Sequence, residues 1–325
     1  MLGRCIFGAA LLVAALAVPA AAEDAKTWKH GIIEPKGDGG ISLMVGERDF
    51  GAKHGLKIEI VKMKNGATAH KALLAGELDS IESSPGAAIL AGAHGADIKI
   101  VGCDWPGVPH GLMVREGIEK IADLKGKTIA VAAPGSLPNL LIGAILEKNN
   151  MAPSDVRFAN LGGDLERYKA VVAGVADGGI VASEFMAVAP KGIKMLIPGH
   201  EALPNYVRLC ITMTNKTIAS RRQDAERFIA AEIDALHFAL THRDETLRVT
   251  REAIHAKEDD PRVPFAYDET VRTKAVDPDV TLPLAKLEWM QEQLVKAGNL
   301  KQPIDLKKIT APEVREAAAK LAATH

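Results

Sequence analysis

The sequence predicts an α/β protein built from two similar lobes, and three observations lead to this fold class. A nine-residue pattern occurs twice: residues 71–79 read KALLAGELD, and residues 169–177 read KAVVAGVAD. Strand-like and helix-like segments alternate over the first two hundred residues, which indicates layered sheets with parallel strands. Beyond residue 213 the apolar spacing becomes helical. The repeat is spaced too widely for a solenoid, and two lobes that face each other would enclose a ligand cleft.

Ten strands are predicted between residues 27 and 213. Each is a short run rich in β-branched or alternating apolar residues. They span residues 27–33, 56–61, 80–82, 98–102, 112–114, 127–132, 156–161, 178–182, 193–197 and 206–213. The last of these would return the chain to the first lobe. Residues 105–111 hold two prolines and two glycines and are predicted as a loop at a domain boundary.

The predicted helices fill the gaps between the strands and make up the tail. Helices are expected over residues 41–50, 86–92 and 137–149, and within each copy of the repeat, where a glycine ends the apolar run. Residues 228–240 and 284–294 continue the helical pattern in the tail. This tail would clamp the two lobes or cover one of them. The expected division is therefore lobe 1 over residues 27–109, lobe 2 over 110–207, and a return to lobe 1 plus C-terminal helices over 208–325.

Residues 1–22 are typical of a cleaved secretory signal peptide. Arg4 gives the positive start, residues 6–18 form an apolar centre, and alanines 20–22 suit cleavage before Glu23. The apolar run is shorter than the ~20 residues that a membrane-spanning helix needs. We therefore expect an exported protein in the periplasm, with an uncleaved membrane anchor as the less favoured alternative.

Composition limits the classes of function. The 40 basic and 41 acidic residues give a formal charge of −1, so no basic excess indicates a nucleic-acid partner. The 4% aromatic content argues against platforms that stack bases or sugars. No P-loop, dinucleotide fingerprint or metal-spaced cysteine or histidine set occurs, so we expect no cofactor. Cys103 and Cys210 remain after signal removal, and they could form a disulfide or stay as two buried thiols.

Four stretches carry a resemblance to a known family. Residues 55–60 read GLKIEI, 73–79 LLAGELD, 121–131 IADLKGKTIAV and 151–156 MAPSDV. In this order and spacing they resemble the periplasmic substrate-binding proteins of nitrate/sulfonate/taurine-type ABC importers, whose fold is shared with the proteins that bind pyrimidine precursors of thiamine. The resemblance implies a type II, two-lobed periplasmic binding protein that works as a monomer. It would capture a sulfonate, carboxylate, nitrate or pyrimidine-like solute and deliver it to an ABC permease in the inner membrane.

The expected site lies on four loops at the carboxyl ends of strands, where backbone N–H groups and helix N-termini face a cleft. Each serine there is equally plausible as a helix cap, and the side chain of Trp105 is expected to be partly structural. Lys36 could serve an anionic solute but would more commonly face solvent, and Arg208 is expected to pair with an acid of the hinge. Asp79 and Asp177 are expected to orient the turn between helix and strand. The candidate ligand-binding residues are Asp38, Gly39, Gly40, Ser42, Ser83, Ser84, Trp105, Ser136, Asn139, Glu184 and Tyr206.

Glu184 gives the sharpest expectation about the solute. A carboxylate in the cleft would repel an anion unless it were protonated or paired, so it favours a ligand with an amine, amide or ring N–H donor. Two alternatives to an import function stay open: an exported enzyme on the same fold, and a binding protein that serves a membrane sensor. The sequence has neither a Gly-x-Ser-x-Gly elbow nor a His-Glu-x-x-His pair, so a non-enzymatic function is preferred.

Overall fold

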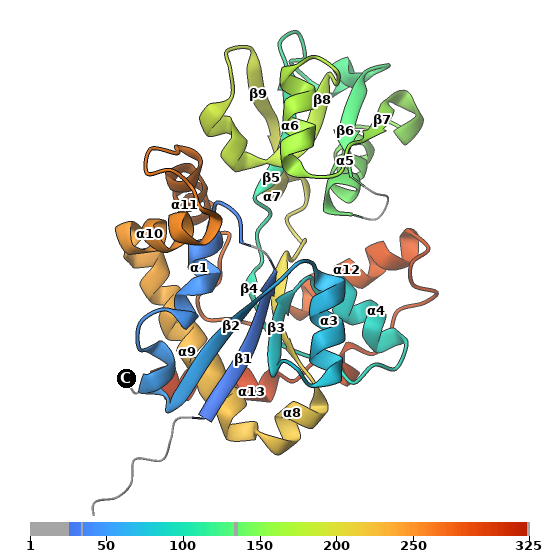
Figure 1. The fold of residues 1–325 in the computed structure, drawn as a ribbon. Helices are drawn as coiled ribbons and strands as arrows, with labels where there is room; N and C mark the ends of the chain where they lie inside the picture. Colours follow the sequence, from blue (N-terminus) through green and yellow to red (C-terminus); the bar gives the residue numbers. More distant parts are fainter. Residues whose placement is uncertain (1–25, 34, 133–135, 324–325) are drawn as a thin grey trace, which may run out of the picture.

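Two five-stranded sheets, one above the other in Figure 1, form the two lobes of the protein. The computed structural model describes residues 26–33, 35–132 and 136–323, so the predicted signal peptide lies outside the described residues. Lobe 1 contains the sheet with strand order β2-β1-β3-β10-β4, and lobe 2 contains the sheet β7-β6-β8-β5-β9. The predicted two-lobed α/β fold is confirmed.

The strands fall close to the predicted runs. They are β1 Lys26–Ile33, β2 Leu56–Met63, β3 Ser80–Ser83, β4 Lys99–Trp105, β5 His110–Arg115, β6 Thr128–Val131, β7 Arg157–Asn160, β8 Gly178–Ala182, β9 Ile193–Pro198 and β10 Leu209–Met213. Trp105 ends strand β4 instead of opening a loop, so the predicted loop at 105–111 shrinks to the four residues between β4 and β5.

Each predicted helix is present in the structure, but the one predicted over residues 41–50 is divided into shorter pieces. The α-helices are α1 Gly39–Leu43, α2 Phe50–Lys53, α3 Gly66–Ala75, α4 Pro85–Ala93, α5 Leu137–Lys148, α6 Asp164–Val172, α7 Gly199–Ala202, α8 Asn215–Ser220, α9 Arg222–Thr241, α10 Arg243–Ile254, α11 Arg262–Arg272, α12 Leu284–Lys296 and α13 Pro312–Ala322. Short 3₁₀ turns are η1 Met44–Gly46, η2 Ile121–Leu124, η3 Pro153–Asp155, η4 Ser183–Val188 and η5 Leu306–Lys308. The single helix predicted over 41–50 is broken into α1, η1 and α2.

Both sheets are mixed, whereas the alternation of strands and helices predicts parallel ones. In lobe 1, β2, β1 and β3 run parallel, and β10 pairs antiparallel with β3 and β4. In lobe 2, β7, β6 and β8 run parallel, and β5 pairs antiparallel with β8 and β9. The antiparallel strand in each sheet is the first one after the chain crosses from the other lobe. Its direction is set by the crossing, which local sequence patterns do not reveal.

The duplicated nine-residue pattern has the same structural role in both lobes. Its glycine, Gly76 after α3 and Gly174 after α6, takes a positive φ of 78° and 76° and turns the chain out of the helix. Its aspartate then accepts a hydrogen bond from the backbone of a neighbouring strand: Asp79 from the N–H of Lys29 in β1 at 2.8 Å, and Asp177 from the N–H of Thr128 in β6 at 2.9 Å. The prediction that these aspartates orient the turn is confirmed.

The chain crosses between the lobes twice, between β4 and β5 and between α7 and β10 (Figure 1). Next to these crossings Cys103 of β4 and Cys210 of β10 form a disulfide. The alternative of two free thiols is therefore wrong. Because the two cysteines are 107 residues apart, the bond closes a loop that holds all of lobe 2.

Lobe 1 packs helices against both faces of its sheet. One face carries α3 and α4 and holds Leu73, Ile81 and Ile89. The other face carries the long helix α9 and α13, and there Trp28 stacks on Phe228 with ring centroids 5.3 Å apart. Two helices of the tail, α9 and α13, therefore cover one face of the lobe 1 sheet.

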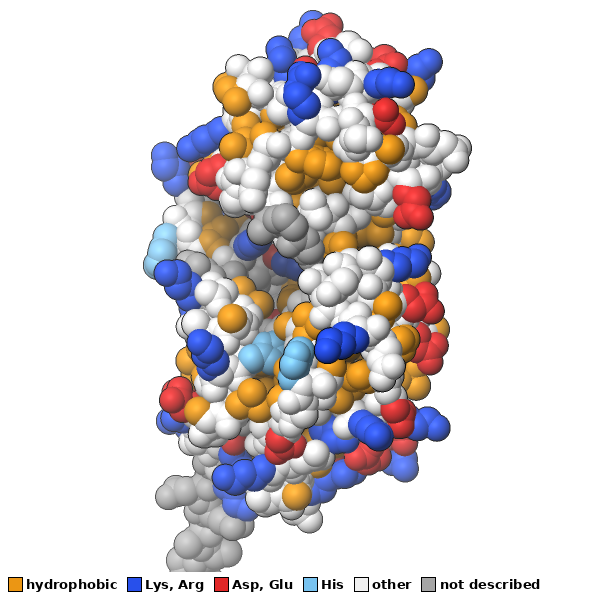
Figure 2. All heavy atoms as spheres, turned by 90° about the vertical axis from the view of Figure 1, so that its right-hand side faces the viewer, with side chains coloured by type: hydrophobic (Ala, Val, Ile, Leu, Met, Phe, Trp, Pro, Cys, Tyr) orange, Lys and Arg blue, Asp and Glu red, His pale blue; other side chains and the backbone are white. Residues whose placement is uncertain are grey.

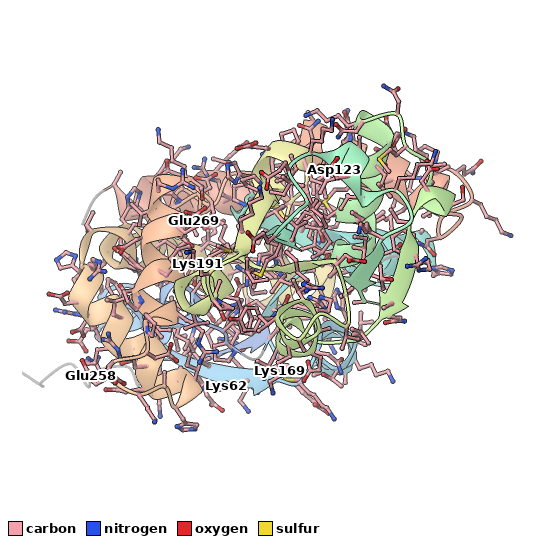
Figure 3. The ribbon with its side chains drawn as sticks, turned by 90° about the horizontal axis from the view of Figure 1, so that it is seen from above. Lys62, Asp123, Lys169, Lys191, Glu258 and Glu269 are labelled. Carbon is pink, nitrogen blue, oxygen red and sulfur yellow. A yellow bond between two sulfur atoms is a disulfide. The ribbon has the colours of Figure 1, made fainter. Side chains whose placement is uncertain are left out.

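Part of the tail also reaches lobe 2. Helix α11 packs against η4, and the guanidinium of Arg262 lies 5.8 Å from the ring centre of Phe185. Figure 3 shows the molecule from above and labels Glu269 of α11 and Lys191 of the segment between η4 and β9. The tail thus contacts both lobes, in line with the predicted clamp. Among the described residues, no helix has the length and hydropathy needed to cross a bilayer.

Candidate functional site

A cavity of about 400 Å³ lies between the lobes, and both lobes contribute to its walls. Much of the wall is apolar, which suits the carbon skeleton of an organic molecule. The apolar lining residues are Ile32, Ile33, Pro35, Trp105, Ala132, Leu137, Pro138 and Leu209. The polar and charged lining residues are Lys36, Asp38, Ser42, Glu82, His110, Asp164, Arg167 and Arg208.

On the lobe 1 side an ion pair joins the loop after β1 to the segment before β10. Arg208 donates through both terminal nitrogens to the carboxylate of Asp38, and its guanidinium lies 4.6 Å from the ring centre of Trp105. Burial opposes ionisation of Asp38, but the charge and hydrogen bonds of Arg208 hold the pKa of this carboxyl below its usual value. Arg208 therefore pairs with an acid next to the hinge, as expected from the sequence.

A hydrogen-bonded chain runs from Trp105 into the sheet. The indole Nε1 of Trp105 donates to Ser42 Oγ at 3.1 Å, and Ser42 Oγ donates to Glu82 Oε1 at 2.9 Å. Glu82 lies on β3, Ser42 on α1 and Trp105 at the end of β4. Three separate elements thus hold the Glu82 carboxyl at the cavity wall.

Two further carboxyl groups lie close to Glu82, inside the layer between the sheet and α9. Glu82, Asp104 and Glu232 are 4%, 1% and 3% exposed. Burial, followed by the charge of Asp104, raises the pKa of Glu82 well above its usual value. Burial, followed by the charge of Glu232, raises the pKa of Asp104 to about 7. The carboxyl groups of Glu82 and Asp104 hydrogen-bond to each other, and this bond raises the pKa of Glu82 and lowers that of Asp104, so Glu82 is the member of the pair that holds the proton.

On the lobe 2 side Asp164, the first residue of α6, gathers three basic side chains. It accepts hydrogen bonds from Arg167 and, at 2.9 Å, from Lys36 of lobe 1, while His110 Nε2 lies 3.3 Å away. Burial opposes its ionisation, but the hydrogen bond from His110 and the charges around it hold the pKa of Asp164 well below its usual value. The Lys36–Asp164 pair is a direct ionic link between the lobes.

Glu184 lies on η4 next to this cavity and is not part of its lining. It approaches Gly37 so closely that a Cβ on that glycine would lie 2.3 Å from Glu184 Oε2. Burial, followed by the charge of Asp38, raises the pKa of Glu184 to about 7. Arg262 of α11 is the first of the nearby cations that oppose this shift.

Four of the eleven residues predicted for the site line the cavity: Asp38, Gly39, Ser42 and Trp105. The other seven have other surroundings among the described residues. The N–H of Gly40 donates to Thr250 Oγ1 at 2.9 Å, and Ser83 is buried near His70. Ser136 and Asn139 lie in the first turns of α5, where the neighbouring residues Leu137 and Pro138 line the cavity.

Ser84 and Tyr206 line a second, smaller cavity of about 290 Å³. Leu140 of lobe 2 and Trp289 of α12 are also part of it. Figure 2 shows hydrophobic side chains along the lobe 2 edge of the groove between the lobes. The two predicted residues are thus together, but they are separated from Asp38 and Trp105.

Sequence reasoning missed Glu82, His110, Asp164 and Arg167 as lining residues. Glu82 falls inside a short strand, where its single charge gave no motif, and His110 lies within the run 105–111 that was predicted as a boundary loop. Asp164 could have been found because it follows Gly162 and Gly163 and opens a helix, which is the arrangement used to predict the other site loops. Lys36 was considered, and its side chain is 51% exposed but paired.

Comparisons with known proteins agree with this architecture. The family described as NMT1/THI5 like matches residues 42–246, which is more than half of the chain. A protein of Brucella abortus (strain 2308), named as a binding protein, is 25% identical over 282 residues, which cover 82% of this chain and 84% of that protein.

Solved structures with this fold include both binding proteins and enzymes. The periplasmic aliphatic sulphonate-binding protein SsuA of Escherichia coli superimposes with a TM-score of 0.71 at 17% identity, over 87% of this chain and 91% of SsuA. The desulfurization enzyme DSZB superimposes with a TM-score of 0.67 at 16% identity, over 91% of this chain and 99% of DSZB. At these identities the structures show the fold alone. With the match over residues 42–246 and the two-lobed architecture, the chain belongs to the NMT1/THI5-like family and has the fold of ABC-type substrate-binding proteins.

Proposed function

We propose that this protein captures a small organic solute between its lobes and delivers it to an ABC importer in the inner membrane. The observation that carries the proposal is the cavity of about 400 Å³ whose lining comes from both lobes. A solute held there contacts lobe 1 through Asp38, Ser42 and Trp105, and lobe 2 through Asp164 and Pro138. Binding therefore favours the closed arrangement of the lobes, which is the state that a permease can distinguish from the empty one.

The size and walls of the cavity bear on the kind of solute. Among sulfonates, carboxylates, nitrate and pyrimidine-like molecules, an organic solute suits the site better than nitrate does. Nitrate would leave most of 400 Å³ unfilled and the apolar wall of Ile32, Leu137 and Pro138 without a partner. The candidate contacts are the four predicted lining residues together with Glu82, His110 and Arg208.

A binding function is favoured over catalysis by the state of the reactive side chains. Ser42, the hydroxyl residue of the described lining, accepts from Trp105 and donates to a carboxyl group, so no histidine base is positioned to activate it. Cys103 and Cys210 are joined in a disulfide. An enzyme such as DSZB shares the fold, so fold alone does not decide this point.

The disulfide and the family favour an exported protein that works in the periplasm. We propose that it acts as a monomer, with lobe 1 formed by residues 27–109 and 208–325 and lobe 2 by residues 110–207. On this division the two crossings serve as the hinge.

A thermal-shift screen tests the proposal. The purified mature protein is heated with sulfonates, carboxylates, nitrate, pyrimidines, amides and amines in separate wells. A solute that binds the folded state stabilises it by about 2.7 kcal/mol when present at one hundred times its Kd, which raises the melting temperature in a concentration-dependent way. The proposal fails if no solute changes the melting temperature and the protein hydrolyses a generic ester or amide.

A further inference from the structure

The charges around the cavity indicate the class of solute more narrowly. We propose that the cavity binds a solute with a cationic, N–H-rich group, an amine or amidine, and that this group is recognised by the carboxyl group of Glu82. The inference rests on the proposed function, because it describes the ligand of the same cavity.

The cations of the cavity are already neutralised by the protein's own acids. Arg208 is engaged with Asp38, and both Lys36 and Arg167 are engaged with Asp164. Arg167 is further held by the backbone carbonyl oxygens of Ile180 and Gly162. An anionic solute would have to break one of these pairs, which would leave a buried carboxylate without its partner.

The helix that begins at the cavity offers no free positive pole either. The N-terminus of α6 lies at the wall, with Gly162 and Gly163 in the lining. Its first residue is Asp164, and the carboxylate of this residue also accepts the N–H of Ala182 at 3.2 Å. A second anion placed at this terminus would therefore meet a negative charge at close range.

In contrast, none of the ion pairs found among the described residues includes Glu82, Asp104 or Glu232. Glu82 reaches the wall, where Ser42 donates to Oε1, and Asp104 and Glu232 lie behind it. Arg208 is the cation that lowers the pKa of both Glu82 and Asp104, but it is already bound to Asp38. A cationic group in the cavity would supply the missing positive charge.

A second acceptor, which is separate from Glu82, Asp104 and Glu232, also favours a solute with N–H groups. His110 lines the cavity and is buried, and burial lowers the pKa of its imidazole, which favours the neutral ring. When Nε2 donates to Asp164, the neutral ring leaves Nδ1 as a bare acceptor. Nδ1 has no hydrogen-bond partner among the described residues. An N–H group of the solute is the chemistry that would satisfy it.

The proposal predicts how binding responds to pH. The groups that face Glu82 are Ser42 of α1, Asp104 of β4, Glu232 of α9 and Arg208 before β10. With the cavity empty, the raised pKa keeps a proton on Glu82. A cation competes with this proton, so the affinity for a cation rises with pH, and the affinity for an anion does not.

Three probes of nearly equal shape separate the possibilities: benzamidine, which is a cation, benzamide, which is neutral, and benzoate, which is an anion. Calorimetry on the mature protein measures each Kd from about pH 5.5 to about pH 8. We expect benzamidine to bind at least about tenfold more tightly than benzoate, with an affinity that increases with pH. Benzoate or benzamide binding as tightly as benzamidine would overturn the inference and leave the proposed function intact.

Matched variants test the role of Glu82. Glu82→Gln keeps the size of the side chain and removes its charge, and we expect it to weaken benzamidine binding at least about tenfold and to abolish the rise with pH. Glu59→Gln removes the same charge from an exposed position on β2 of the same sheet, and its Kd should stay within about twofold of the unmodified protein. Equal loss in both variants, or none in Glu82→Gln, would contradict the proposal.

A broader amine and carboxylate panel covers solutes that are not aromatic. If members of the anionic half bind and the amines do not, the inference is wrong and the binding function stands. If neither the three probes nor any member of the panel binds, the proposed function is overturned together with the inference.

Discussion

Lobe 1 and lobe 2 repeat one connectivity, with strand orders β2-β1-β3-β10-β4 and β7-β6-β8-β5-β9. They also repeat the turn in which a glycine ends a helix and an aspartate holds the next strand. The lobes differ three residues after that aspartate, where Glu82 of lobe 1 corresponds to Ile180 of lobe 2. The same strand position is therefore polar and buried in one lobe and apolar in the other.

We interpret this difference as one between residues that build the fold and a residue that selects the solute. The shared aspartates stabilise each sheet in the same way and do not line the cavity, whereas Glu82 does. A buried carboxyl group costs folding free energy unless it is paired, so its place in lobe 1 is best explained by binding. Ile180 pairs with Leu112 of β5, and its side chain is part of the hydrophobic core.

The disulfide joins two strands of lobe 1, and its removal has the largest expected effect on stability. Replacing Cys103 and Cys210 with alanine frees a loop that spans the whole of lobe 2, and we expect a loss of about 4 kcal/mol in the free energy of unfolding. Guanidinium unfolding followed by circular dichroism measures it, with the disulfide-intact protein as reference. If the double substitution left the guanidinium concentration at the unfolding midpoint unchanged, the disulfide would contribute nothing to the stability of lobe 1.

The two repeat aspartates form a matched pair. We expect Asp79→Ala to cost about 2 kcal/mol and Asp177→Ala about 1 kcal/mol, because Asp79 accepts from Lys29 N–H and from Arg221, and Asp177 accepts from Thr128 N–H. Urea unfolding of both variants side by side gives the comparison. Equal costs would mean that the link to Arg221 contributes nothing.

Glu232→Gln tests the cost of the buried carboxyl cluster. Burial, followed by the charge of Glu82, raises the pKa of Glu232 in the folded state, so the native protein loses stability as pH rises from the unfolded pKa of about 4.3 through the folded pKa. Glutamine removes this loss. We expect a melting temperature about 2–4 °C higher at pH 8, with a difference that shrinks toward pH 4.5. A lower melting temperature at pH 8 would contradict the assignment.

The ion pair between the lobes has the smallest expected effect. Lys36 is half-exposed, so Lys36→Ala should change the free energy of unfolding by less than about 1 kcal/mol. If the pair helps to hold the lobes closed, small-angle scattering of the empty variant will show a larger radius of gyration. The exposed Lys125–Asp155 pair within lobe 2 is the control, and Lys125→Ala should leave the radius unchanged.

Several features of the fold could be predicted because their signals are local. The strands, the glycine turns, the roles of Asp79 and Asp177 and the pairing of Arg208 follow from spacing and composition. The break in the first helix was missed, although Gly46 lies in it, because apolar residues at 41, 43, 44 and 45 suggested one continuous face. Trp105 was assigned to a loop because Pro106 and Gly107 follow it directly.

The site was predicted only in part because its residues are brought together from distant segments. Asp38, Gly39, Ser42 and Trp105 were found from loops and helix starts. Glu82 lies in strand β3, where successive side chains point to opposite faces of the sheet. Only the pairing of β3 with β10 and the hydrogen bond from Ser42 of α1 place Glu82 at the cavity. Ser84 and Tyr206 were assigned to one site with Asp38, but a separate cavity holds them.

The sequence by itself determined that this protein has two α/β lobes of similar build, because a duplicated turn and an alternating strand pattern are written in contiguous residues. Tertiary structure alone decided the direction of β5 and β10, the closure of the disulfide and the charge balance of the cavity. These depend on which distant segments meet when the chain crosses between lobes. The pairing of Arg208 and Arg167 with acids at the cavity depends on these contacts, and so does the position of Glu82 at its wall.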